Sequence, residues 1–363
     1  MSDFCDLNSE ELLIWVRNQG AKDFQARQLL DWVYGKFVFD WDQMMNLSKD
    51  FRKEIAKSLK LPVIELVKIQ PSDDLQTYKF LWKLREGSFV ESVLICSDTR
   101  RTVCVSSQIG CPAKCAFCAS GKQGFVRNLR PAEIVEQVLQ INQWLLAKNE
   151  RVSHIVYMGM GEPLKNYDSV VKSIRILSDP ELLNISERRI TVSTVGIVEG
   201  IKRLSIEGLK VNLVLSLHAP NQHIRQKIIP YARKYPLDDI MSAMDDYSKK
   251  TKRDITFEYT LIADINDHPD HAHELSHLLH GRQCTVNLIP YNPVPGIRLQ
   301  RPDKKAIKNF RTVLFGSKIV NTCRYTKGDD IAAACGQLAL KEMEAPVATI
   351  AEEKPAGLVM LKS

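Results

Sequence analysis

Residues 111–118 read Cys-Pro-Ala-Lys-Cys-Ala-Phe-Cys, and this stretch decides how the rest of the chain is interpreted. It places three thiols at intervals of four and three residues, in a loop marked by Gly110, Pro112 and Gly121. Thiolates are soft ligands that suit zinc or iron–sulfur centres. Structural zinc commonly uses two separated pairs of ligands, and no second pair with that spacing occurs in the chain. Three thiolates would instead leave one iron of a 4Fe-4S cubane open.

Helical and extended patterns alternate after this cysteine loop. Pro131 begins an amphipathic stretch that reaches about Leu146, and apolar runs follow at intervals. The predicted strands are His154–Met158, Arg189–Val195, Lys210–Leu217, Ile255–Leu261 and Thr285–Pro290. Repeated βα units imply parallel strands joined by right-handed crossovers. The sequence therefore predicts an α/β fold with an open or closed parallel barrel.

The segment before the cysteine loop divides into a helical part and a short β part. Residues 8–60 show helical periodicity, beginning with a capping box formed by Asn8 and Glu11. From Leu75 the apolar residues recur with a period of two, which is typical of strands. The predicted strands are Tyr78–Leu84, Ser88–Cys96 and Thr102–Ser107. We predict an N-terminal helical accessory domain over residues 1–70, a β extension over 71–103 and a catalytic barrel over 104–341. The last predicted element is Asp329–Leu338, and residues 342–363 have the composition of a disordered tail.

Composition narrows the class of protein. The chain has 363 residues, 44% of them hydrophobic, and no apolar run of about 18 residues that could span a membrane. It does not begin like a signal peptide, so we expect a soluble, cytoplasmic protein. Nine cysteines are too few for a disulfide scaffold of this length, and the formal net charge of +7 permits binding to a polyanion.

The spacing Cys111, Cys115, Cys118 is the signature of the radical S-adenosylmethionine (SAM) superfamily, whose members chelate SAM on the open iron of a 4Fe-4S cluster. Two further segments are expected to lie near that cofactor. Gly159-Met-Gly-Glu-Pro163 follows a predicted strand, where glycines let a ligand approach the backbone and Glu162 could accept a hydrogen bond from the methionine ammonium. Ser193, Ser216 and His218 also end predicted strands, although a polar residue there is more often a cap.

Several motifs together resemble one family, the RlmN and Cfr RNA methyltransferases of the radical SAM superfamily. The matching stretches are Cys104-Val-Ser-Ser-Gln-Ile-Gly-Cys111, the cluster loop, Gln123-Gly-Phe-Val-Arg-Asn-Leu129, Gly159–Pro163, Ser216-Leu-His218, Tyr291-Asn-Pro293 and Ile331-Ala-Ala-Ala-Cys-Gly-Gln337. The resemblance implies a partial (β/α)6 radical SAM barrel. It further implies methylation of adenosine carbon 2 in 23S rRNA, at the peptidyl transferase centre, and in tRNA, at the adenosine 3′ of the anticodon.

The same resemblance implies roles for two distant cysteines. Carbon 2 of adenine is electron-poor, so it cannot attack a sulfonium methyl as an ordinary nucleophile. Cys335 would therefore first accept a methyl group from one SAM. A 5′-deoxyadenosyl radical from a second SAM would activate this methyl group for addition to adenine. Cys104 would then release the product by forming a transient disulfide with Cys335, which an external thiol reduces.

The proton on carbon 2 must also leave, and the candidates are Cys104 and Glu91. In the predicted strand, Glu91 alternates with Phe89, Val93 and Ile95, which places it on an apolar face where burial would raise its pKa. The opposite face, with Val90, Ser92 and Leu94 inward and Glu91 solvated, remains open on pattern alone. The family resemblance favours Glu91 as a proton acceptor.

The resemblance also carries over a set of SAM contacts and partners. The contacts are Gly161, Glu162, Ser193, Ser216, Leu217, His218 and Asn292. The implied partners are 23S rRNA, tRNA, a flavodoxin-like electron donor for the cluster and a thiol reductant, and the expected state is a monomer. Two alternatives stay open: a carbon-8 adenosine methyltransferase of the Cfr type, and a zinc-stabilised RNA-binding module.

Overall fold

A ten-stranded mixed sheet organises the chain, which is described here from a computed structural model over residues 2–62, 64–323 and 328–338. The strand order is β14-β13-β12-β11-β10-β9-β6-β5-β4-β3, and the strands from β6 to β14 all pair in parallel. These parallel strands are β6 (Arg101–Cys104), β9 (His154–Tyr157), β10 (Ile190–Thr194), β11 (Asn212–Ser216), β12 (Ile255–Leu261), β13 (Cys284–Pro290) and β14 (Val320–Cys323).

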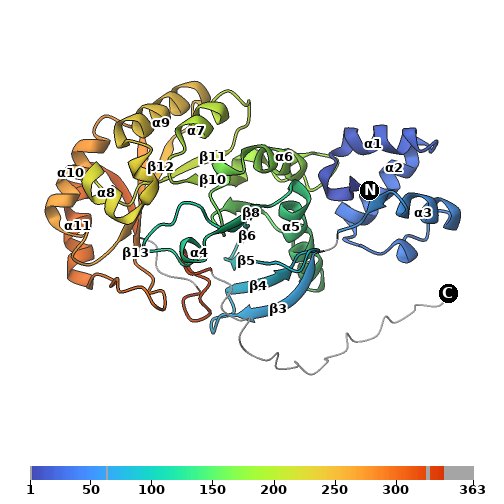
Figure 1. Ribbon diagram of the computed structural model, residues 1–363, viewed down its shortest axis with the longest axis horizontal. Coiled ribbons are helices and arrows are strands. Elements are labelled where there is room, and N and C mark those ends of the chain that lie inside the picture. The colour runs from blue at the N-terminus through green and yellow to red at the C-terminus, as the bar shows by residue number, and fades with distance from the viewer. Residues whose placement is uncertain (1, 63, 324–327, 339–363) are drawn as a thin grey trace.

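Helices follow each of the first six parallel strands, and the longer ones, such as α5, α6 and α9, cover the outside of the curved sheet (Figure 1). They are α4 (Ala119–Lys122), α5 (Pro131–Leu145), α6 (Tyr167–Ser178), α7 (Val198–Leu204), α8 (Gln222–Ile228), α9 (Leu237–Thr251), α10 (Pro269–Leu279) and α11 (Lys304–Gly316). Six βα units with β14 beyond them confirm the predicted α/β fold with a partial (β/α)6 barrel. The units α11 and β14 were not predicted from the sequence.

The β extension is antiparallel and adds three strands to the barrel sheet. β4 (Thr77–Lys83) and β5 (Phe89–Cys96) were predicted, and β5 pairs with β6. β3 (Glu65–Pro71) pairs with β4 and lies beyond the predicted helical pattern of residues 8–60, at the end of the range 1–70 assigned to the accessory domain. A strand was not predicted here, because β3 is exposed along most of its length and shows no clear apolar alternation.

The N-terminal region is helical, with α1 (Ser9–Asn18), α2 (Asp23–Leu30) and α3 (Lys49–Ala56) set beside the barrel (Figure 1). The predicted capping box is present: the Glu11 backbone N–H donates to Asn8 Oδ1 at 2.8 Å, and Glu11 accepts from the Asn8 backbone. A short β1 (Ser2–Asp3) pairs with β2 (Leu59–Lys60). Ser9 Oγ donates to Asp179 Oδ2 at 2.6 Å, so the start of α1 is tied to the end of α6.

The cysteine loop is held by a small hairpin and by the end of the described chain. β7 (Gln108–Gly110) pairs with β8 (Phe125–Asn128) on either side of the loop. Ser120 Oγ donates to the Leu338 carbonyl at 2.7 Å. The stretch Asp329–Leu338, predicted as an element, contains only turns, so that prediction is wrong. The predicted tail, 342–363, lies outside the described residues. In the described part of the chain, no helix is long and apolar enough to cross a membrane.

Candidate active site

The three cysteines of the loop line one cavity of about 130 Å³ at the carboxyl ends of the parallel strands. Cys111 and Cys115 are 8% exposed, and Cys118 is half-buried. Burial raises the pKa of all three thiols, that of Cys111 to about 12. The thiols are therefore protonated at neutral pH unless a bound metal displaces the protons.

The arrangement of these thiols fits a cluster better than a single metal ion. Among the described residues, no three Cys, His, Asp or Glu side chains are gathered closely enough to hold one ion. In a cubane each thiolate binds a different iron, so the sulfur atoms are spread more widely than the ligands of one zinc. The donor set, three soft thiols in one enclosed cavity, suits a 4Fe-4S cluster held by Cys111, Cys115 and Cys118.

The glycine loop after β9 forms one wall of the same cavity. Gly161 has φ +110°, and a Cβ there would come within 2.7 Å of Gln108 Cβ and Ser107 Oγ, so only glycine fits. The next residue, Glu162, is buried and accepts the backbone N–H groups of Leu164 at 3.0 Å and Val195 at 2.8 Å. Burial raises the pKa of Glu162 to about 7.

Polar side chains from β10 and β11 reach the cavity beside this carboxyl group. The hydroxyl oxygens of Ser193 and Ser216 lie 3.1 Å apart. His218 has φ +55°, and its Nδ1 accepts the Thr260 backbone N–H at 2.9 Å, so the neutral ring carries its proton on Nε2. Burial lowers the pKa of His218 to about 3. Leu217, which follows β11, does not line the cavity, and its side chain belongs to the hydrophobic core.

Asn292 connects the end of β13 to the segment that carries Cys335. Its Nδ2 donates to the Cys335 carbonyl at 3.2 Å, and its Oδ1 accepts from Arg301 Nη2 at 2.8 Å. Asn292 is buried and Cys335 is exposed, and both also line the cluster cavity.

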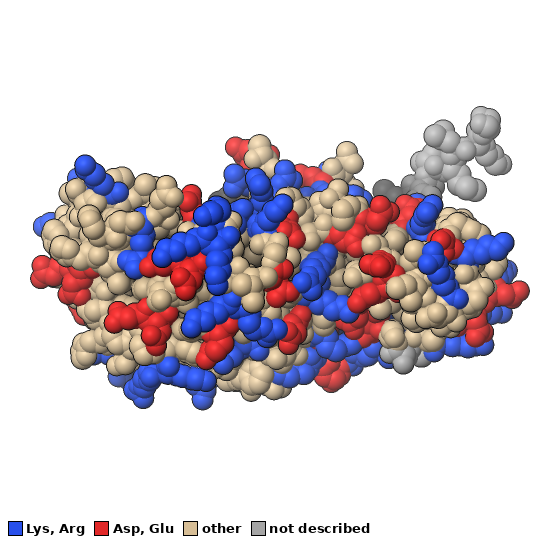
Figure 2. All heavy atoms as spheres, turned by 90° about the horizontal axis from the view of Figure 1, so that it is seen from above, with Lys and Arg blue, Asp and Glu red and all other residues tan. Residues whose placement is uncertain are grey.

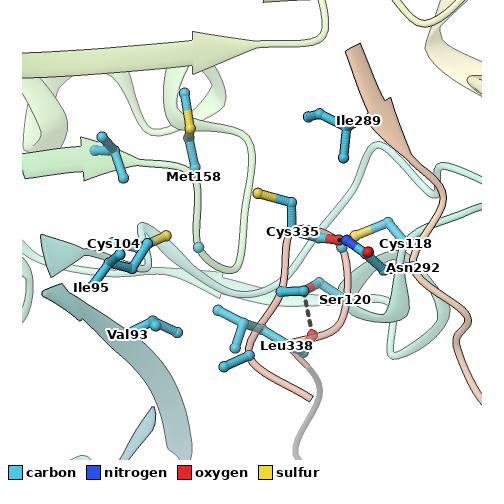
Figure 3. A pocket seen from close by; sticks show the side chains of 15 residues that line it. Val93, Ile95, Cys104, Cys118, Ser120, Met158, Ile289, Asn292, Cys335 and Leu338 are labelled. Carbon is cyan, nitrogen blue, oxygen red and sulfur yellow. Dashed lines mark hydrogen bonds between the residues drawn. The ribbon is translucent and has the colours of Figure 1, made fainter. Parts of the chain in front are cut away.

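A second cavity of about 320 Å³ adjoins the first and contains both distant cysteines. Cys104, at the end of β6, and Cys335 enter it from opposite sides, with their sulfur atoms directed inward (Figure 3). Its remaining walls are mainly apolar, with Val93 and Ile95 from β5 and Ile289 from β13. Cys118 and Cys335 line both cavities, so the second cavity opens toward the cluster site.

Glu91 lies on β5 on the same face as Val93 and Ile95, which line this second cavity. It is 2% exposed, so the alternative in which Glu91 is solvated is wrong. Both faces of β5 are covered, because Val90 is buried on the opposite side. Lys79 Nζ lies 3.5 Å from Glu91 Oε1, and Glu91 itself is not in the cavity wall.

Two polar side chains of β12 that line the cavity were not predicted from the sequence. Glu258 and Thr260 on β12 both line the cluster cavity. With Thr256 they form a polar series of period two in a strand that is otherwise apolar. This alternation could have indicated that the three side chains share one face of the strand. Arg225 on α8 was also missed, and it lies fully buried behind the cluster loop.

The fold and the three-cysteine cavity together define a radical SAM enzyme, and residues 105–275 match the Radical SAM superfamily. Residues 2–61 match the ribosomal RNA large subunit methyltransferase N-terminal domain. This chain belongs to the RlmN family of dual-specificity RNA methyltransferases within that superfamily. Members of the superfamily use a 4Fe-4S cluster and SAM, which agrees with the chemistry of the site.

Individual relatives match over nearly the whole chain. The probable dual-specificity RNA methyltransferase RlmN 2 of Protochlamydia amoebophila is 69% identical over 360 residues, 99% of this chain and 98% of the relative. The corresponding protein of Fervidobacterium nodosum is 46% identical, over 92% of this chain and 96% of the relative. The crystal structure of a radical SAM methyltransferase from Sphaerobacter thermophilus superposes with a TM-score of 0.91 at 40% identity, covering 93% of this chain and 99% of that one.

Proposed function

We propose that this protein methylates carbon 2 of an adenosine in 23S rRNA and in tRNA, with Cys335 as the methyl carrier and Cys104 as the resolving thiol. One observation supports this most strongly: two cysteines far apart in the chain line one cavity, and one of them also lines the cluster cavity. A radical enzyme that acted directly on its substrate would have no use for this second pair of thiols.

Cys335 lies where a methyl carrier is needed. It is exposed, so SAM can reach its sulfur, and it belongs to both cavities, so its methyl group can face the SAM site on one side and adenine on the other. The cluster, when bound, supplies the electron that cleaves the sulfonium of SAM. Asn292 holds the Cys335 backbone through its amide and thereby orients the methyl carrier. Two SAM molecules are consumed per methylation, one for the methyl group and one for the radical.

The second cavity suits an adenine ring. Its mainly apolar walls exclude water from the reacting carbon, and Cys104 opposite Cys335 can attack the Cys335 sulfur to release the product. Glu91 behind Val93 is the proposed proton acceptor, and because it is outside the cavity wall, the proton reaches it only through a small rearrangement or a relay. A thiol reductant, available in the cytoplasm, returns the pair to thiols.

The charge of the segments around the cluster supports a polyanionic substrate. Residues 104–132, 208–237 and 275–302 carry the cluster cysteines, Ser216, His218 and Asn292, and they include lysines and arginines but no Asp or Glu. Phosphate contacts of RNA require such surfaces. The face seen in Figure 2 differs from these segments, because basic and acidic side chains are interspersed on it.

The proposal is tested by mass spectrometry of nucleosides after incubation of reconstituted enzyme with a 23S rRNA fragment or tRNA. Wild-type protein is expected to form 2-methyladenosine in both. Cys335→Ala is expected to form none while keeping its cluster, and Cys104→Ala is expected to accumulate a covalent adduct between protein and RNA. Cys284→Ser is the matched control, because Cys284 lines neither cavity, and it should behave as wild type.

Three results would contradict the proposal. Methylation by Cys335→Ala would refute the methyl-cysteine route. Normal turnover by Cys104→Ala would refute its resolving role. Formation of 8-methyladenosine would assign the enzyme to the carbon-8 class. Electron supply is tested in the same assay, since a reduced flavodoxin-like protein is expected to support turnover.

A further inference from the structure

Arg225 is a fully buried cation beside the proposed cluster site, and none of the roles above requires it. It lies on α8 between Ile224 and Ile228, which pack in one hydrophobic cluster with Cys111 and Cys115. Its exposed fraction is 0%. The adjoining end of α8 contacts the cysteine loop directly, because the Ala116 backbone N–H donates to the Ile228 carbonyl at 2.8 Å.

Among the described residues, the hydrogen bonds of the guanidinium all go to backbone carbonyls. Nε donates to the Leu217 carbonyl at 3.2 Å, and Nη2 donates to the carbonyls of Val195 at 2.5 Å and Ser216 at 3.2 Å. These bonds fix the group between the ends of β10 and β11. No carboxylate of a described residue accepts a hydrogen bond from it, and Nη1 has no hydrogen-bond partner among the described residues.

A buried charge without a counter-charge is costly, and proteins normally pair it. Burial lowers the pKa of Arg225 to about 10, so the group stays charged at neutral pH. The groups whose negative charge would act on it most directly are Cys115 and Glu162. Cys115 is a proposed cluster ligand, and as a thiolate bound to iron it would provide the missing negative charge.

We propose that Arg225 is the electrostatic partner of the iron–sulfur cluster, with its free Nη1 directed to the Cys115 side of the centre. Reduction adds one electron and makes the centre more negative by one charge. A fixed cation beside it therefore stabilises the reduced state and raises the reduction potential, since net charge and hydrogen bonds set the potential of such clusters. Arg225 acts as a positioning and tuning residue, and it need not touch SAM or RNA.

The test is a redox titration of the reconstituted cluster, followed by visible absorption and electron paramagnetic resonance, without SAM or RNA. Arg225→Gln and the volume-conserving Arg225→Met should lower the ratio of reduced to oxidised cluster about tenfold at a fixed ambient potential. For a one-electron couple, this is a fall of about 59 mV in the reduction potential. Arg225→Lys, which keeps the charge, should stay close to wild type. Both neutral variants remove the charge, but Gln keeps a polar side chain and Met does not. If one of them does not fold, the other still tests the effect of the charge.

Arg52→Gln is the matched control. Arg52 is a buried arginine of the N-terminal domain, and its Nη1 also donates to backbone carbonyls, those of Trp41 at 2.8 Å and Asp42 at 2.9 Å. It should lose stability with no change in cluster potential. The proposal is overturned if the Arg225 variants behave in the same way. It is also overturned if the potential is unchanged and only the affinity for SAM falls, because the cation would then serve the cosubstrate. Since no RNA is used, neither outcome depends on the proposed substrate.

Discussion

Replacing Gly161 by alanine tests whether the glycine loop is fitted to its neighbours as closely as the structure indicates. A residue with a side chain at φ +110° carries backbone strain of about 1–3 kcal/mol. The added methyl group would lie 2.7 Å from Gln108 Cβ and from Ser107 Oγ, and overpacking of this kind costs about 1–3 kcal/mol more. The free energy of unfolding should therefore fall by about 2–6 kcal/mol.

Gly208→Ala separates the two contributions. Gly208 has φ +79°, and a Cβ there meets nothing within 4 Å, so only the backbone cost of about 1–2 kcal/mol applies. Urea unfolding followed by circular dichroism gives both free energies. Binding of SAM to the reconstituted protein should weaken about tenfold or more in Gly161→Ala only, because a shifted Gln108 would no longer accept the Glu162 N–H, now at 2.8 Å. If Gly161→Ala lowers the free energy of unfolding by an amount within about 0.5 kcal/mol of that for Gly208→Ala, the close packing is refuted.

Three further predictions concern the cavities. Because burial raises the pKa of Glu162 to about 7, the folded state holds a proton that the unfolded state releases above its ordinary pKa. Stability should therefore fall as pH rises from about 4.5 to 7, by about 3 kcal/mol. Glu162→Gln should remove this slope, and an unchanged slope in urea unfolding would show that another group causes it. Asn292→Ala should remove a hydrogen bond worth about 1 kcal/mol from the Cys335 carbonyl, and iodoacetamide should then label Cys335 about fivefold faster. Equal labelling rates would show that the amide does not restrain this segment. After removal of iron by chelation, peptide mapping at pH 8 should find Cys335 alkylated well before Cys111, whose thiol pKa is about 12, and the reverse order would contradict the burial of Cys111.

The cluster loop and the barrel could be predicted from sequence because their signals are local. The interval from Cys111 to Cys118 is short enough to form one loop in almost any fold, and period two or 3.6 reports which face of each element is buried. The same periodicity also indicates the direction of the Leu217 side chain. Leu217 stands between Ser216 and His218, so alternation places its side chain away from theirs. Ile224 and Ile228 likewise place Arg225 on the inner face of α8.

Other features followed only from packing between distant segments. Glu91 is buried because β5 is covered on both sides, and its pairing with Lys79 depends on the register of β4 against β5. Strand β3 has little apolar alternation, and it is a strand because β4 offers a free edge. Local pattern carries no information about a neighbouring strand or a covering layer.

The three-thiol loop after a first barrel strand, and with it the class of chemistry, could be recognised without any structure. Only the folded structure shows that Cys104 and Cys335 share one cavity next to that loop, and that Arg225 is buried behind it with no hydrogen-bonded carboxylate among the described residues. The physical reason is the range of each constraint. Spacing along the chain fixes which residues of one loop or strand face the same way, whereas the meeting of residues from the two ends of a barrel depends on how strands and helices pack around a common core.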